Sequence, residues 1–88
     1  MKKFRVEVSQ TVEVELDESK FTDAFMEEFR RSFFPFFEIG EHAEHIAQMV
    51  ARGVIDVSPS YFIEGYGPAR DMGIKAEITG TEIDGWPA

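Results

Sequence analysis

The sequence predicts a small α+β domain with the element order β-α-α-β-β, in which two helices pack on one face of a three-stranded, mostly antiparallel sheet. Three observations support this prediction: polar and apolar residues alternate over residues 4–16, apolar residues recur at helical spacing in two central segments, and alternation returns over residues 74–79. With 88 residues, 43% of them hydrophobic, the chain can hold one core. We assign residues 1–84 to this single domain and expect residues 85–88 to form a frayed tail.

The first strand is expected over residues 4–16. Its even positions are apolar except for Gln10, and they are occupied by Phe4, Val6, Val8, Val12, Val14 and Leu16. One long strand fits this pattern, and so does a hairpin with a three-residue loop over residues 9–11. Such a loop favours glycine, which is absent there, so we favour the long strand. Its even side chains should then meet the helices, and its odd side chains should face solvent.

The first helix is expected to begin after Thr22, a suitable N-cap, and to end before Pro35, which disfavours helical backbone at the preceding residue. Its apolar stripe consists of phenylalanines spaced four residues apart: Phe25, Phe29 and Phe33. The four phenylalanines around Pro35 predict a corner between two helices, and the alternative is that one ring is exposed to anchor a partner.

The second helix is expected from Glu41 to Arg52, because Ile46 and Val50 lie on one face and Gly53 follows as a helix-terminating residue. Short strands are expected over residues 61–64 and 74–79, joined by a glycine-rich loop. Loops of this length carry binding residues more often than short ones, so Tyr66, Arg70 and Asp71 are candidate partner-binding residues.

The composition excludes several functions. Seventeen acidic residues against nine basic ones give a net charge of −8, which disfavours direct binding to nucleic acid or to an anionic membrane. The absence of cysteine excludes disulfides and thiolate metal sites, and it fits a reducing compartment. We find neither the apolar segment of a signal peptide nor an apolar run long enough to span a membrane, so we expect a cytoplasmic protein.

No residues form a recognisable catalytic arrangement, and we expect no enzyme activity and no cofactor. His42 and His45 share a helix face, where we expect them at or near the surface. Because a metal site needs three or four converging ligands, we assign no metal residues. A metal or small ligand held by His42 and His45 is the third of three functional alternatives.

The acidic residues themselves are the main candidate site. The first helix should expose Asp23, Glu27 and Glu28, and the open sheet face should carry Glu7, Glu13, Glu15 and Glu77. Alternate residues of a strand are about 6–7 Å apart, which approximates the phosphate spacing of a nucleic-acid strand. These carboxylates, together with the loop residues named above, are predicted to bind the basic surface of a nucleic-acid-binding protein complex.

Four features bear on function: the lack of cysteine, the acidic strand Val12–Leu16, the aromatic helix Phe25–Phe29 and the loop Gly65–Gly73. In these features the chain resembles small acidic phage or prophage accessory proteins of the anti-CRISPR inhibitor type. The resemblance implies a non-enzymatic monomer or homodimer in the cytoplasm of a bacterial host, which binds a complex such as a CRISPR effector and blocks it. The alternative is a phage structural, assembly or homo-oligomerisation module, which would use the phenylalanine cluster and an open sheet edge.

Overall fold

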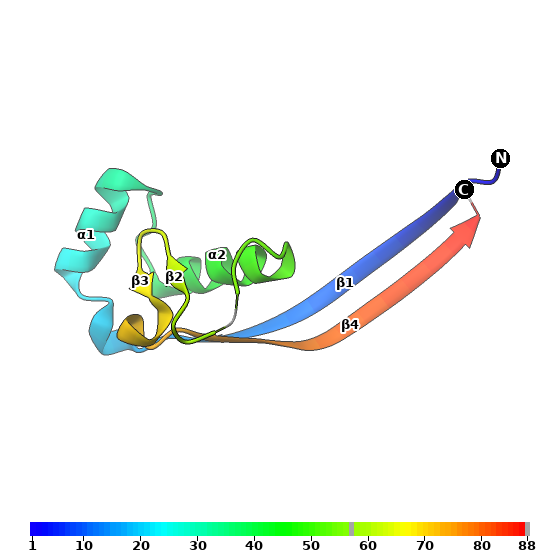
Figure 1. Ribbon diagram of the computed structural model, residues 1–88. Coiled ribbons are helices and arrows are strands. Elements are labelled where there is room, and N and C mark those ends of the chain that lie inside the picture. Colours follow the sequence, from blue (N-terminus) through cyan, green and yellow to red (C-terminus); the bar gives the residue numbers. More distant parts are fainter. Residues whose placement is uncertain (57, 88) are drawn as a thin grey trace.

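The computed structural model describes residues 1–56 and 58–87, which contain two helices and two separate antiparallel sheets (Figure 1). The elements are β1 (Phe4–Glu15), α1 (Asp23–Ser32), α2 (Ile39–Ala51), β2 (Phe62–Ile63), β3 (Gly67–Pro68) and β4 (Lys75–Pro87), with single-turn 3-10 helices η1 (Glu18–Lys20) and η2 (Ala69–Met72). The α+β class is confirmed. The three-stranded sheet is wrong, because Phe62–Ile63 pairs with Gly67–Pro68 instead of joining the ribbon formed by β1 and β4.

The ribbon is a long two-stranded antiparallel structure. β1 is one continuous strand, as favoured, and all twelve of its residues have partners in β4. The strand predicted over residues 74–79 therefore extends much further, to Pro87. Residues 85–87, expected in a frayed tail, pair with Phe4–Val6, and Ala88 lies outside the described residues.

A bulge interrupts the ribbon near its middle. Thr11 pairs with Gly80 and Val12 pairs with Ile78, so Thr79 has no opposite residue. Side chains alternate between faces along a strand, and one extra residue reverses the parity of everything beyond it. Ile83 therefore lies on the same face as Ile78, and the ribbon bends near this point (Figure 1).

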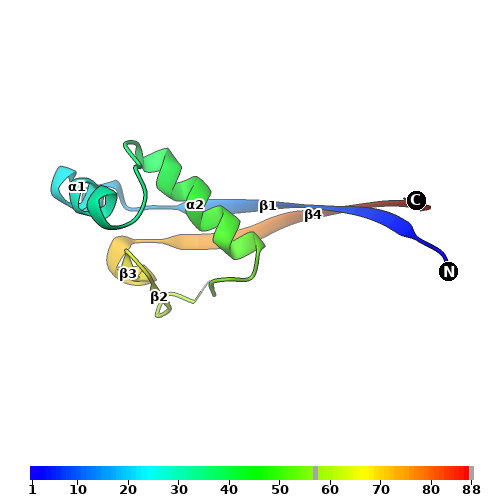
Figure 2. The ribbon, with the colours of Figure 1, turned by 90° about the horizontal axis from the view of Figure 1, so that it is seen from above.

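The body of the molecule consists of α1, α2 and the β2–β3 hairpin around one core. The α1 helix begins as predicted, with the Thr22 hydroxyl accepting a hydrogen bond from the Phe25 N–H at 3.1 Å. α2 crosses the part of the ribbon nearest the body (Figure 2). The buried core residues come from every part of the body: Phe21, Met26, Phe29, Ile46, Val50, Ile63, Tyr66, Ala69, Met72 and Ile74.

The molecule is strongly elongated. Its extents are 55 × 24 × 18 Å and its radius of gyration is 16.1 Å, against about 12 Å for a compact domain of this length. The cause is the ribbon, which continues well beyond α2, with both chain ends at its far end (Figure 1). Within the described residues, no helix combines the length and apolar character needed to cross a membrane.

Candidate functional site

The ribbon has two parts with different surroundings. We call residues 12–15 and 75–78 the base, and residues 4–11 and 80–87 the arm. At the base, Val12, Val14 and Ala76 pack against the core. On the arm the same face continues as Phe4, Val6, Val8 and Ile83, each of which is more than half exposed. One apolar face thus runs along the whole ribbon, and the body covers only its base. The expectation that all even positions of the first strand meet the helices is therefore wrong for the arm.

The outer edges of the arm have no neighbouring strand among the described residues. In the part of the chain that the structure describes, the residues of β1 form no backbone–backbone hydrogen bonds outside their ladder with β4. An isolated two-stranded ribbon is marginally stable in water, and stability usually requires a third strand or a packed face. Free strand edges are also templates for pairing with another chain. The arm therefore combines an uncovered apolar face with free strand edges.

The opposite face of the ribbon is acidic. Glu13 lies directly opposite Glu77, and Glu7 lies opposite Asp84. Glu13, Glu15 and Glu77 also line one hollow together with Lys75. Like charges directly opposite one another destabilise an antiparallel pair. A positive charge placed beside these carboxylates would therefore stabilise the ribbon. The structure thus brings Glu7, Glu13, Glu15 and Glu77 onto one face.

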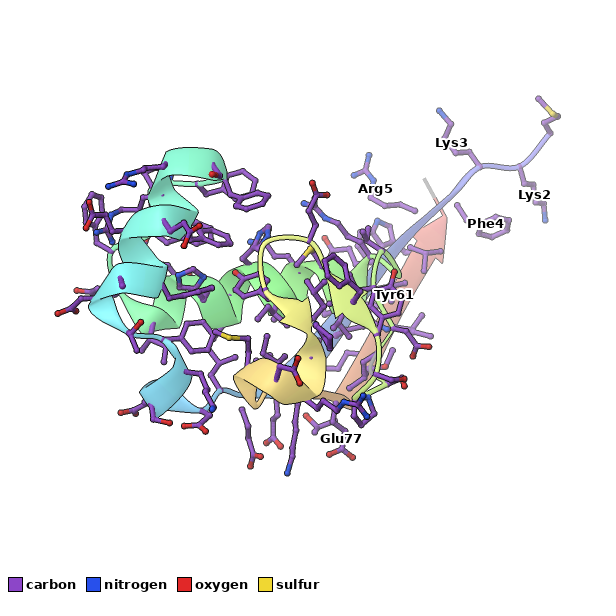
Figure 3. The ribbon with its side chains drawn as sticks, turned by 60° about the vertical axis from the view of Figure 1, so that its left-hand side comes forward. Lys2, Lys3, Phe4, Arg5, Tyr61 and Glu77 are labelled. Carbon is purple, nitrogen blue, oxygen red and sulfur yellow. The ribbon has the colours of Figure 1, made fainter. Side chains whose placement is uncertain are left out.

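Positive charge is concentrated at the tip of the arm. Lys2, Lys3 and Arg5 provide three of the nine basic residues, and none of the seventeen acidic residues lies among the first five positions. The rest of the chain therefore holds six basic and seventeen acidic residues. Figure 3 shows these three side chains and Phe4 at the far end of the ribbon, well separated from Glu77. Among the described residues, the one ion pair within 4 Å joins Arg31 and Glu27, so the tip is not neutralised within the chain.

The predicted acidic residues of α1 are not brought together with those of the ribbon. Asp23, Glu27 and Glu28 are exposed on α1, which lies at the end of the molecule opposite the arm (Figure 1). Glu27 is engaged by Arg31, with its Oε1 atom 2.7 Å from the guanidinium. The predicted set of carboxylates therefore divides between two distant surfaces.

The phenylalanine cluster contributes both to the core and to the surface. Phe36 stacks on Phe29 with ring centroids 5.7 Å apart, and it packs against the core. Phe33, Phe34 and Phe37 are exposed, and the Arg30 guanidinium lies 4.7 Å above the Phe37 ring. The sequence left two alternatives for this cluster, a corner packed into the core or an exposed ring. The structure shows both, because Phe36 is packed and the other three rings are exposed.

The glycine-rich loop does not present all its predicted binding residues. Arg70 and Asp71 are exposed on η2, but Tyr66 is buried, and its assignment as a partner contact is wrong. Its hydroxyl lies 2.7 Å from Nδ1 of His42, which has no exposed surface. Tyr66 faces inward because a tight turn returns the chain from β2 to β3, with a hydrogen bond from the Tyr66 N–H to the Ile63 carbonyl.

His42 is a core residue and not the surface histidine that the sequence predicted. Five aromatic rings, those of Phe21, Phe25, Phe29, Phe36 and Tyr66, have centroids within 6.0 Å of its ring. Its Nε2 atom is buried without a hydrogen-bond partner in the described structure. Burial, with a smaller effect of the charge on His45, lowers the pKa of His42. Over residues 1–56 and 58–87, no three His, Cys, Asp or Glu side chains are placed to hold a metal ion.

Sequence reasoning missed the arm because the bulge breaks the alternation in its second strand. Ile78 and Ile83 differ in parity, so residues 80–87 look like a polar tail until the extra residue at Thr79 is taken into account. The twelve-residue alternation of β1 was a usable indication of the arm, since a strand of that length needs a partner of similar length.

Comparison with protein-family models, with curated proteins and with solved structures finds no match to this chain.

Proposed function

We propose that the protein is a non-enzymatic self-association module, and that its arm is the element that docks onto a second copy. The observation that carries this proposal is the apolar face of the ribbon, which the body covers at the base and leaves open on the arm. An isolated two-stranded ribbon is stabilised when another chain packs against its apolar face or forms hydrogen bonds with its free edge.

Charge complementarity supports a second copy as the occupant. The tip is basic and the polar face of the ribbon is acidic, so two arms that lie in opposite directions place each tip beside the other copy's acidic face. A two-fold arrangement of this kind is the commonest symmetry of soluble homo-oligomers, and it uses the same patch on both copies.

The magnitudes are compatible with a stable dimer. Full burial of a Val, Ile or Phe side chain contributes about 1.5–3 kcal/mol. A symmetric dimer offers eight such side chains from the two arms: Phe4, Val6, Val8 and Ile83 from each copy. Association costs about 4–15 kcal/mol in lost freedom of motion, so partial burial of these side chains, together with new hydrogen bonds along the strand edges, offsets it.

Sedimentation equilibrium of the untagged protein over a range of micromolar concentrations tests the proposal. We expect a concentration-dependent dimer, and we expect Val8→Ser to shift it towards monomer because a hydroxyl would replace an apolar contact. Val54→Ser is the matched control, since Val54 is 61% exposed and Val8 is 59% exposed, but Val54 lies off the arm. A monomer throughout the range, or equal effects of the two variants, would contradict the proposal.

A second candidate function is inhibition of a nucleic-acid-binding complex, such as a CRISPR effector, by the acidic face of the ribbon. The observation that favours it is the two pairs of opposed carboxylates, Glu13 with Glu77 and Glu7 with Asp84. Among the described residues none of these four forms an ion pair within 4 Å, and the basic residues of the same face are Arg5 and Lys75. Such carboxylate pairs suit a basic channel that normally holds nucleic acid.

Pull-down against basic nucleic-acid-binding complexes, with a salt titration, tests this second candidate. Binding should weaken steeply with salt, and it should be lost in the double variant Glu13→Lys with Glu15→Lys. The matched control is Glu28→Lys with Asp23→Lys, which makes the same charge change on α1. Binding that both double variants reduce equally would reflect overall charge and would remove the special role of the ribbon.

A further inference from the structure

The outer edge of β1 is better suited to pairing than the outer edge of β4. β1 is a regular strand of twelve residues, whereas β4 contains the bulge at Thr79. A bulge disrupts the regular spacing of edge N–H and C=O groups and is one of the devices that prevent edge pairing. The edge of β1 has no such protection, and none of its residues is proline or glycine.

Hydrogen bonding restricts how two copies of β1 can pair. Along a regular strand, alternate residues direct both the N–H and the C=O towards the same edge. Two antiparallel copies therefore form ladder bonds only where odd residues lie opposite odd residues and even opposite even. For two copies of β1, the position numbers of opposite residues must then add to an even number. Every such alignment also places the two apolar faces on the same side of the joint sheet.

Charge and length of overlap together select one alignment among these. If opposite positions add to 18, Arg5 lies opposite the partner's Glu13, and Lys3 lies opposite the partner's Glu15. A sum of 20 sets Glu7 against the partner's Glu13, and a sum of 14 sets Glu7 against itself, so both place like charges together. A sum of 16 leaves Arg5 opposite Thr11 and retains only the pairing of Lys3 with Glu13. A sum of 12 also sets opposite charges together, Arg5 against the partner's Glu7, but it pairs only residues 4–8 of each strand.

We infer that two copies pair through the free edges of β1 in antiparallel alignment, about a two-fold axis at Ser9. This inference rests on the proposed self-association and specifies its geometry. The resulting four-stranded sheet sets Phe4 opposite the partner's Val14 and Val6 opposite the partner's Val12, which places the exposed apolar residues of each arm beside the base that the other copy's body covers. On the other face, Arg5 lies next to the partner's Glu13, which itself lies beside Glu77, and so neutralises the like-charge pair.

Single cysteines test the alignment, because the natural chain contains none. Directly opposite residues have Cα atoms about 4.5–5.5 Å apart, within the range that a disulfide bridges. Ser9→Cys should therefore form a covalent dimer on mild oxidation. Glu7→Cys and Thr11→Cys should not cross-link to themselves, because each lies about 13 Å along the strand from its own counterpart. A mixture of these two variants should cross-link, since residue 7 lies opposite residue 11.

Swapping the charges of Arg5 and Glu13 tests the same alignment independently. Arg5→Glu should weaken dimerisation roughly tenfold at low salt, because it reverses two symmetry-related pairs. Adding Glu13→Arg to Arg5→Glu should restore dimerisation, and Lys20→Glu, which makes the same charge change in η1, should leave it unaltered.

These experiments distinguish failure of the Ser9-centred alignment from failure of self-association itself. A dimer in sedimentation that cross-links through Glu7→Cys alone, or that is not restored by the charge exchange, overturns the alignment and leaves self-association standing. A protein that stays monomeric at all concentrations overturns both.

Discussion

The hydrogen bond between Tyr66 and His42 lies inside the hydrophobic core, surrounded by phenylalanine rings. Buried polar groups are costly unless they are paired, and this pair satisfies Nδ1 of His42 while leaving its Nε2 atom without a partner in the described structure. An unsatisfied ring nitrogen makes the stability of the body sensitive to the remaining bond.

Tyr66→Phe removes the hydroxyl that lies 2.7 Å from Nδ1 of His42 and leaves a buried imidazole with no partner. We expect the free energy of unfolding to fall by about 1–3 kcal/mol, measured by urea denaturation. Tyr61→Phe is the matched control, since the Tyr61 hydroxyl is exposed and makes only a 3.4 Å contact with the Val54 carbonyl. Its effect should stay within about 0.5 kcal/mol. Equal losses in the two variants would show that the buried bond contributes nothing.

The same histidine predicts a pH dependence. Burial lowers the pKa of His42 below its usual 6.5, so the folded protein holds the ring neutral where the unfolded chain takes up a proton. Stability from this group is fully present above pH 6.5 and is lost as pH falls from there through the folded-state pKa. The urea midpoint should therefore decrease between pH 7.5 and 5.5, and the His42 ring should titrate below 6.5 by NMR.

His45 contributes in the same direction, because partial burial also lowers its pKa. The decrease should therefore be smaller, but still present, in His45→Gln. A His42 ring that titrates at or above pH 6.5 in the folded protein would contradict this account.

At the scale of elements, local sequence rules predicted the helices well and the strands poorly. The cap at Thr22 and the spacing of Phe25 and Phe29 are local features, so α1 follows from the sequence. The partner of a strand is a non-local property. Residues 61–64 have the aromatic and β-branched composition of a sheet strand, yet a tight turn at Glu64–Gly65 pairs Phe62 and Ile63 with the adjacent Gly67–Pro68. The second half of β4, residues 80–87, escaped recognition because one bulge residue reverses its parity.

A buried side chain of the body and an exposed side chain of the arm should respond differently to mutation. Ile46 in α2 is fully buried, so Ile46→Ala should lower the free energy of unfolding by about 2–5 kcal/mol. Ile83 on the arm is 72% exposed, so Ile83→Ala should change the stability of dilute protein by less than about 0.5 kcal/mol. Urea denaturation at low concentration checks both values. A large loss in Ile83→Ala under those conditions would mean that the arm is packed within the monomer.

At the scale of the whole molecule, the sequence predicted which carboxylates share the open face of the strands, but not how far that face lies from the acidic residues of α1. The fold concentrates Glu13, Glu15 and Glu77 on the ribbon and leaves Asp23 and Glu28 at the other end. Only the pairing of β1 with β4 reveals that Lys2, Lys3 and Arg5 lie at one end of an elongated molecule, far from Glu77 (Figure 3). Composition and periodicity cannot supply this, because net charge has no direction and alternation does not identify the partner of a strand.

Hydrogen exchange of the backbone amides, followed by NMR at low and at high protein concentration, tests the central claim that the arm associates through the edge of β1. On association, the outward-facing amides of residues 4–14 should exchange at least about tenfold more slowly, since they gain ladder hydrogen bonds. The outer-edge amides of residues 80–87 should change little. Exchange in the arm that does not depend on concentration, or new protection confined to α1 and the phenylalanine cluster, would contradict the account.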